Sequence, residues 1–200
     1  MRKRQFLRAT VGSTVAGLAA WPAATVAQHA PTTARGPIVL TVSGAIGAGN
    51  RGEFDPALDQ MMGKQKIAFD KAHVFDFAAL AAMPPATIKP TLEYDSKAHA
   101  LKGPLLIDVL KACRAQLADT TALFLRAVDG YAASVTVAEA RQRLFIVATH
   151  LDGVPMALGG LGPLWAVYDA DRFPDMAAKP VNERFASCPW AMYHVEVKAI

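Results

Sequence analysis

The sequence predicts a single α+β domain, rich in β-strands, over residues 37–200. Segments rich in β-branched and aromatic residues outnumber the helical segments, and the two kinds do not follow the regular β-α-β order of a doubly wound sheet. The chain of 200 residues has the length of one domain and contains no internal repeat. Its hydrophobic content of 52% is sufficient for a substantial core.

The first half of this domain is expected to alternate strands with short helices. Strands are predicted over 37–46, 66–70 and 86–95, where β-branched and aromatic residues gather. Short helices are predicted over 54–65 and 75–84, because each range has an aspartate near its start that can cap a helix. The stretch 86–95 also contains a proline, which favours an edge strand or an irregular one.

The second half is expected to hold one clear helix and most of the strands. Apolar residues recur at helical spacing over 103–117 and predict that helix. Two strands joined by the Asp129-Gly130 turn are expected within 122–137, followed by a short helix over 138–142. The remaining strands are expected within 143–156, 162–173 and 190–200.

Residues 1–27 have the features of a secretory signal peptide, with a basic start, a mildly apolar run and Thr25-Val26-Ala27 before the expected cleavage site. The apolar run is too short to cross a bilayer, which takes about 20 residues, so no stable membrane insertion is expected after cleavage. The start, Lys3-Arg4-Gln5-Phe6-Leu7, resembles a twin-arginine export signal with lysine in the first position, and an ordinary export signal is the alternative. Residues 28–36 are expected to be a linker. The mature protein is therefore expected to be periplasmic or secreted.

The net charge of +4 belongs to the signal peptide. Removal of residues 1–27 takes away four basic residues and no acidic one, which leaves 17 of each in the mature chain. No basic patch or run remains, so nucleic acid is not expected as a partner.

The two cysteines, Cys113 and Cys188, leave two alternatives open. An oxidising compartment permits a disulfide between them. Cys113 also ends an apolar helical run, where a buried free thiol is equally suitable. Neither cysteine has a nearby pair of histidines, so the spacing does not predict a zinc site.

The stretch from Gly47 to Gly52 reads GAGNRG and matches the G-x-G-x-x-G pattern of dinucleotide-binding loops. The preceding strand is expected to end by Gly44, before the pattern begins, and Glu53 and Asp55 stand where a pyrophosphate would bind. We therefore interpret this stretch as a flexible loop after the first strand.

From Phe75 onward, a series of short motifs occurs in a characteristic order. The motifs are FDFAALAAMPPATIKPTLEYD, LKGPLLIDVLKAC, VDGYAASVTVAEARQRLFIVATHLDGVPM, GPLWAVYDADRF and WAMYHVEV. Over about 125 residues they resemble the molybdopterin-binding domain of the sulfite oxidase-like oxidoreductases, in particular small exported members that consist of this domain alone. The resemblance implies a mixed α+β fold and a pterin dithiolene cofactor that carries molybdenum.

The chain departs from this family at the metal position. The resemblance implies a cysteine ligand in the loop after the Thr91-Leu92 pair, whereas this loop, from Thr91 to His99, contains none. Glu93 and Asp95 offer hard oxygen atoms instead of a thiolate, so we predict no metal ligand. The cofactor-binding candidates that the resemblance implies are Glu93, Tyr94, His99, Tyr131, Trp165 and Arg184, with Arg126 and His150 as further groups for anions.

Two functional hypotheses follow for the mature chain. In the first, it is an exported molybdopterin-dependent oxidoreductase of unassigned substrate, with Glu93 or Tyr94 at the metal position. In the second, it has no cofactor and binds a small-molecule ligand or a periplasmic protein partner, for example as a sensory module. No Ser-His-Asp or Cys-His spacing and no G-x-S-x-G motif occurs, so hydrolysis has no support and no catalytic residue is assigned.

Overall fold

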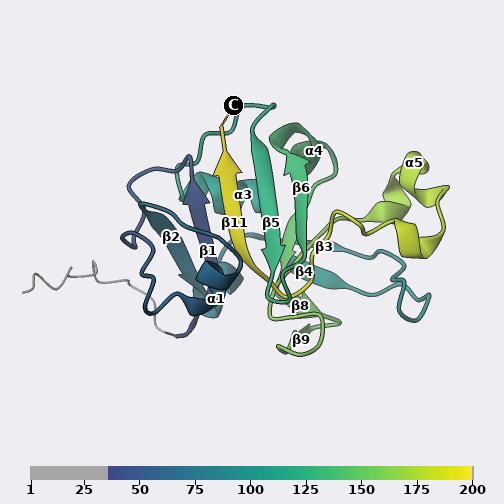
Figure 1. Ribbon diagram of the computed structural model, residues 1–200. Coiled ribbons are helices and arrows are strands. Elements are labelled where there is room, and N and C mark those ends of the chain that lie inside the picture. Colours follow the sequence, from purple (N-terminus) through teal and green to yellow (C-terminus); the bar gives the residue numbers. More distant parts are fainter. Residues whose placement is uncertain (1–35, 200) are drawn as a thin grey trace, which may run out of the picture.

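The computed structural model describes residues 36–199 (Figure 1). The signal peptide expected over 1–27 and all but the last residue of the expected linker lie outside the described residues. Within the described part of the chain, no helix has the length and apolar character needed to cross a membrane.

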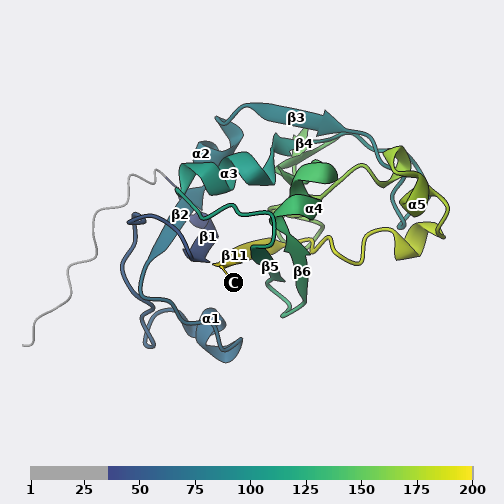
Figure 2. The same ribbon diagram turned by 90° about the horizontal axis from the view of Figure 1, so that it is seen from above.

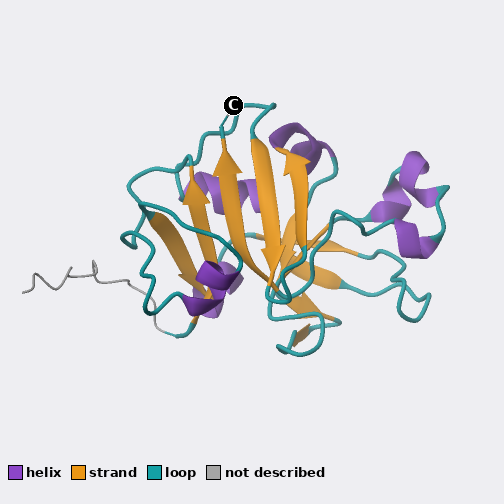
Figure 3. Ribbon diagram, in the orientation of Figure 1, coloured by secondary structure: helices purple, strands orange, loops and turns teal. Residues whose placement is uncertain are grey.

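A five-stranded sheet forms the centre of the molecule (Figures 1 and 3). Its strand order is β2-β1-β11-β5-β6. β1 and β11 pair in parallel, and the other three pairings are antiparallel. The strands are β1 (Ile38–Gly44), β2 (Ala72–Asp76), β5 (Ala122–Ala127), β6 (Ala132–Thr136) and β11 (Met192–Lys198).

Two smaller sheets accompany the central one. A four-stranded sheet has the order β3-β4-β8-β9, and a two-stranded sheet pairs β7 with β10. Their strands are β3 (Pro85–Ile88), β4 (Leu101–Pro104), β7 (Ile146–Ala148), β8 (His150–Leu151), β9 (Val154–Pro155) and β10 (Trp165–Val167). The described residues thus form one mixed α/β domain with open sheets in which strands predominate.

The helices are short and lie around the sheets. Figure 2 shows α2 and α3 on one face of the central sheet, and α1 on the other. The helices are α1 (Gln60–Lys64), α2 (Phe77–Ala81), α3 (Leu106–Ala112), α4 (Val137–Gln142) and α5 (Pro174–Ala177), with 3₁₀ turns at η1 (Ala170–Arg172) and η2 (Val181–Glu183). The Asp76 side chain caps α2 by accepting from Ala79 N, which confirms the cap predicted there.

The core lies between the central sheet and α3. Leu40 and Leu125 on the sheet and Leu106 and Leu110 on the helix are all fully buried. Each such side chain stabilises the fold by about 1.5–3 kcal/mol relative to an exposed one. A second, small cluster of Met62, Ile67 and Tyr193 anchors the α1 region on the opposite face.

Several predicted element boundaries are wrong, among them that of the strand predicted over 86–95, which is β3 and ends at Ile88. Residues 66–70 form no strand, and the strand of this region is β2, which begins at Ala72. The helix predicted over 54–65 begins only at Gln60, because the Asp55 carboxylate accepts from the Ala57 and Leu58 amides and caps a separate turn. The helix predicted over 103–117 is α3 alone, because Gly103 belongs to β4.

The GAGNRG stretch is not the flexible loop that the sequence suggested. The Asn50 side chain accepts from Val74 N at 2.7 Å and donates to Val74 O at 3.0 Å, like an additional residue of the sheet edge. Gly49 has a φ of +74°, and a Cβ there would come within 2.3 Å of Ala72 O. No helix begins at Gly52, so the stretch lacks the geometry of a dinucleotide-binding loop.

Both cysteines are buried free thiols, which settles the alternative left open by the sequence. Cys113 and Cys188 are unpaired with one another. Burial raises the pKa of each thiol to about 12, so neither is ionised near neutral pH.

Candidate functional site

A cavity of about 210 Å³ lies where three segments that are distant in sequence come together. They are the loop that contains Glu93 and Tyr94, the turn between β5 and β6, and the segment 182–190. The lining residues are Glu93, Tyr94, Ala127, Asp129, Tyr131, Asn182, Phe185, Ala186, Cys188, Pro189 and Trp190. We call this feature the aromatic cavity.

The β5–β6 turn supplies Asp129 and Tyr131. The Asp129 carboxylate accepts from the Tyr131 amide at 2.9 Å, and Gly130 takes a φ of +93°, which a glycine adopts without strain. The Tyr131 hydroxyl donates to the carbonyl of Ala186 at 2.5 Å. This hydrogen bond joins the turn to the segment on the other side of the cavity.

The segment 182–190 packs against Trp165 of β10. The fully buried indole of Trp165 donates from Nε1 to the carbonyl of Cys188 at 2.8 Å and lies 6.0 Å from the ring of Phe185. A β-bridge also joins Trp165 to Trp190. Trp190 is thereby held at the mouth of the cavity with its side chain partly exposed.

The loop after β3 supplies Glu93 and Tyr94. The Tyr94 ring lies 6.5 Å from that of Trp165, tilted by 50°. Burial raises the pKa of Tyr94 to about 12, and the charge of Glu93 and a hydrogen bond to it act in the same direction. The phenol therefore stays protonated at neutral pH and donates to the Glu93 carboxylate.

The electrostatic character of the cavity is acidic. Glu93 and Asp129 are both among its lining residues, and none of the described residues that line it is Lys, Arg or His. Cys188 is also among the lining residues, but burial keeps its thiol protonated. Across residues 36–199, no cluster of three or more His, Cys, Asp or Glu side chains is arranged to hold a metal ion.

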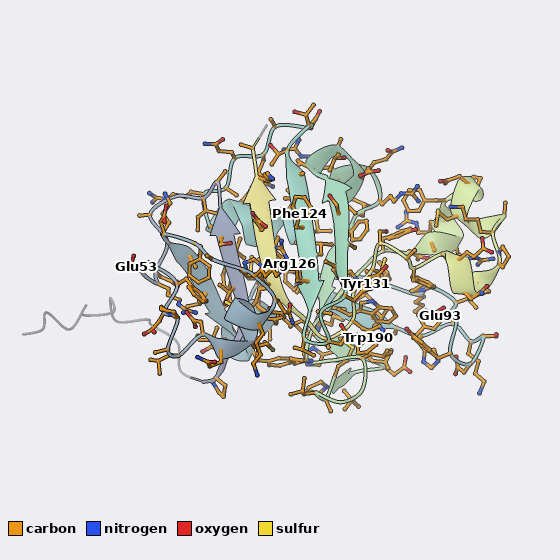
Figure 4. The ribbon with its side chains drawn as sticks, in the orientation of Figure 1. Glu53, Glu93, Phe124, Arg126, Tyr131 and Trp190 are labelled. Carbon is orange, nitrogen blue, oxygen red and sulfur yellow. The ribbon has the colours of Figure 1, made fainter. Side chains whose placement is uncertain are left out.

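The structure brings three of the six sequence-derived candidates together. Glu93, Tyr94 and Tyr131 line the aromatic cavity, and Trp165 lies beneath it, in the core. Figure 4 shows Glu93, Tyr131 and Trp190 on the same side of the molecule.

His99 lies in the same loop as Glu93 but does not line the cavity. Its Nδ1 is 2.7 Å from the Asp152 carboxylate, and its Nε2 is 3.0 Å from that of Asp95. Both hydrogen bonds raise the pKa of His99, and the one with Asp152 has the larger effect. The side chain fastens the loop to the turn between β8 and β9.

The three other cationic or histidine candidates are also engaged away from the aromatic cavity. Arg184 donates to the Asp171 carboxylate at 2.7 Å and to two carbonyl groups. Arg126, on β5, binds Glu196 at 2.8 Å and lies over the ring of Phe124 (Figure 4). His150 lies 2.8 Å from the hydroxyl of Thr149.

Sequence reasoning missed the contribution of the segment 182–190. Asn182, Phe185 and Trp190 lie in turns and connections without regular periodicity, and Trp190 was expected only as the first residue of the last strand, within 190–200. Asp129 was recognised only as a turn residue. The usable signal is the aromatic content of the strands expected within 162–173 and 190–200, because aromatic rings can stack against a planar ligand as well as fill a core.

Comparisons with known proteins give a distant structural likeness. No family model matches the sequence, and no curated protein matches it. Among solved structures, the crystal structure of the sulfane dehydrogenase SoxCD from Paracoccus pantotrophus is similar with a TM-score of 0.51 and 11% identity. The match covers 80% of this chain but only 37% of that chain. At this identity the likeness concerns the fold alone: this chain is similar in architecture to part of an oxidoreductase.

Proposed function

We propose that this chain is an exported domain that binds a small molecule in its aromatic cavity, on a fold of the sulfite oxidase-like molybdopterin-binding type. The order of the sequence motifs and the likeness to a sulfane dehydrogenase support this fold type. The cavity volume of about 210 Å³ falls below the range of about 300–1,000 Å³ that is usual for drug-sized ligands. This volume therefore favours a ligand smaller than a drug-sized molecule.

The single observation that carries the proposal is the convergence of aromatic side chains on the cavity. Among the large hydrophobic side chains that are exposed in the described region, three are aromatic: Tyr94, Tyr131 and Trp190. All three line the aromatic cavity. Aromatic side chains grouped in one concavity beside a few polar groups are typical of small-molecule sites.

The residues present do not fit the molybdopterin group that the sequence resemblance implies. That group needs a thiolate for its metal and basic side chains for its anionic tail. Glu93 and Asp129 would instead repel an anion, and the described lining contains no cationic side chain. The thiol of Cys188 is held protonated by burial. We therefore assign the cavity to a free ligand.

The metal content of the exported protein tests this assignment. The protein is purified from the periplasm of a host that makes the molybdenum cofactor, and molybdenum is measured by mass spectrometry. We expect none, together with perturbation of Trp190 and Tyr131 resonances by small fragments in amide NMR spectra. Molybdenum close to one atom per chain, or a fragment collection that leaves these resonances unmoved, would overturn the proposal.

A substituted variant makes the test more specific. Glu93→Cys places a thiol in the loop where the resemblance implies one, with Glu53→Cys as the control on the far side of the molecule (Figure 4). We expect neither variant to acquire molybdenum, because Asp129 remains in the cavity and the described lining still offers no cationic side chain for the anionic tail of the cofactor. Metal uptake by Glu93→Cys alone would show a retained cofactor pocket and contradict the assignment.

A molybdopterin-dependent oxidoreductase is the second candidate function. Its support is the likeness to a sulfane dehydrogenase and a signal peptide close to the twin-arginine type, which exports folded proteins. Stoichiometric molybdenum in the experiment above is the result expected for this candidate.

A further inference from the structure

Resting on the proposed function, we infer that the aromatic cavity selects a small organic cation of the alkylammonium class, held by aromatic ring faces and by the carboxylates of Glu93 and Asp129. Such a cation combines a positive charge with an apolar surface. The cavity offers carboxylates to the positive charge and aromatic rings to the apolar surface.

The aromatic side chains are accessible to a ligand. Trp190 is 37% exposed, Tyr131 48% and Tyr94 55%, although large aromatic side chains are more often covered. A cation over the face of Trp or Tyr is attracted by the negative potential of the ring, and Trp gives the strongest attraction. Ring faces around a concavity are the arrangement by which proteins recognise quaternary ammonium groups.

Contacts within the protein hold the side chains of Tyr131 and Tyr94 and the backbone of Trp190 before any ligand arrives. Tyr131 is fixed by its hydrogen bond to Ala186, Tyr94 packs near Trp165, and the Trp190 backbone is bridged to Trp165. Side chains that are already ordered lose little conformational entropy on binding. The cavity is therefore preorganised for a ligand that contacts rings.

The charge of the cavity has the sign that a cation requires. Glu93 and Asp129 both line it, and the Asp129 carboxylate keeps a second oxygen besides the one that accepts from Tyr131. A neutral ligand would gain no charge–charge attraction from these carboxylates, and an anion would be repelled by them.

The arginines near this region do not compensate that charge, because each is engaged elsewhere. Arg126 binds Glu196, Arg143 binds Asp175 and Arg184 binds Asp171, at 2.7–2.8 Å. Two of them also lie over aromatic rings of their own, Arg126 over Phe124 and Arg143 over Tyr168. None of these three arginines therefore neutralises the carboxylates of Glu93 and Asp129.

A pair of ligands of nearly equal shape tests the inference. The mature protein is titrated with choline and with its neutral isostere, in which a carbon atom replaces the quaternary nitrogen, and the Trp190 indole and Tyr131 amide are followed by NMR. We expect choline to bind at least about tenfold more tightly, with shifts centred on these resonances. Equal affinity for the two compounds, or no response to choline, overturns the inference.

Matched substitutions locate the preference for charge. Glu93→Gln and Asp129→Asn each preserve size and an acceptor oxygen, and each is expected to weaken choline binding about fivefold while leaving the isostere unaffected. Glu53→Gln, at an exposed position on the opposite side of the molecule, is the control and is expected to change neither (Figure 4). An unchanged choline affinity in both cavity variants overturns the role of the carboxylates.

The two proposals fail in different ways. If fragments bind at Trp190 without any preference for cations, the ligand class is wrong and the binding function stands. If the purified protein carries stoichiometric molybdenum, the binding function itself is wrong.

Discussion

The hydroxyl of Tyr131 and the carbonyl of Ala186, 55 residues apart in sequence, are joined by a hydrogen bond of 2.5 Å across the mouth of the aromatic cavity. This contact fixes the β5–β6 turn against the segment that carries Trp190. It also fixes the distance between the turn that carries Tyr131 and the segment that carries Trp190.

Removal of the Tyr131 hydroxyl tests this connection. Tyr131→Phe is expected to lower the free energy of unfolding by about 1 kcal/mol, because the Ala186 carbonyl loses its protein donor. Choline binding is expected to weaken only slightly, since the ring face remains, whereas Tyr131→Leu removes the ring and is expected to reduce binding strongly. Urea unfolding and the NMR titration measure the two effects. Equal loss of binding in both variants would contradict a role for the ring.

A second relationship concerns the buried histidine of the central sheet. His194 is fully buried, with Nε2 2.9 Å from Ser43 Oγ and Nδ1 3.3 Å from the Arg126 guanidinium. Because a guanidinium only donates, Nδ1 accepts and Nε2 carries the proton toward Ser43. The imidazole therefore cannot act as a base toward this serine in the arrangement observed, and the pair has a structural role.

The stability of the fold is expected to depend on pH through His194. Burial, and then the charge of Arg126, lowers the pKa of His194 to about 3, from 6.5 for an unburied histidine. Between these values the unfolded chain binds a proton that the folded chain does not, so stability is complete above pH 6.5 and falls as the pH falls toward 3. The slope from this one group approaches about 1.4 kcal/mol per pH unit.

Urea unfolding of the wild type and of His194→Gln between about pH 7.5 and pH 4.5 measures this dependence. The variant is expected to be less stable at neutral pH but to lose less stability on acidification. The difference between the two proteins isolates His194 from His73, whose pKa burial also lowers. Parallel pH profiles for the two proteins would contradict the prediction.

The elements with strong local signals were predictable from the sequence. The strand at Ile38–Gly44, the two strands around Asp129-Gly130 and the helix within 103–117 are confirmed, because the residues of each segment have a pattern typical of that structure. β2 and β4 were missed. Both are short, and each takes part in pairing with strands distant in sequence, so their local residues carry little of the information that defines them.

The candidate site was predictable only in part for the same reason. Glu93, Tyr94 and Tyr131 came from the family resemblance, and the structure places them around one cavity. The resemblance gave no indication that Trp190 and Asn182 would join them, because the segment 182–190 has no periodicity and is positioned by contacts with Trp165 and Tyr131. His99 and Arg184 came from the same resemblance, but their side chains are used in local ion pairs outside the cavity.

The crossing of β4 over β7 depends on a glycine. A Cβ at Gly103 would come within 1.9 Å of the Val147 carbonyl oxygen, which is backbone and cannot move aside. Gly103→Ala is therefore expected to destabilise the fold by about 3 kcal/mol or more, or to prevent folding. Gly52→Ala, where nothing lies within 4 Å of the added carbon, is the control and is expected to be close to neutral. Urea midpoints, or the yield of folded protein, measure the difference, and similar values for the two variants would contradict the crossing.

The two buried thiols give a prediction about the redox state of the purified protein. Since burial raises the pKa of Cys113 and Cys188 to about 12, roughly one thiol in ten thousand is ionised at about pH 8, and only the thiolate reacts with iodoacetamide. We expect no alkylation of the native protein and two modified cysteines after unfolding in urea, by intact mass spectrometry. Rapid reaction of Cys188 in the native state would show that the cavity wall opens readily. A native mass lower by two hydrogen atoms, with no thiol available after unfolding, would show a disulfide in place of the free thiols.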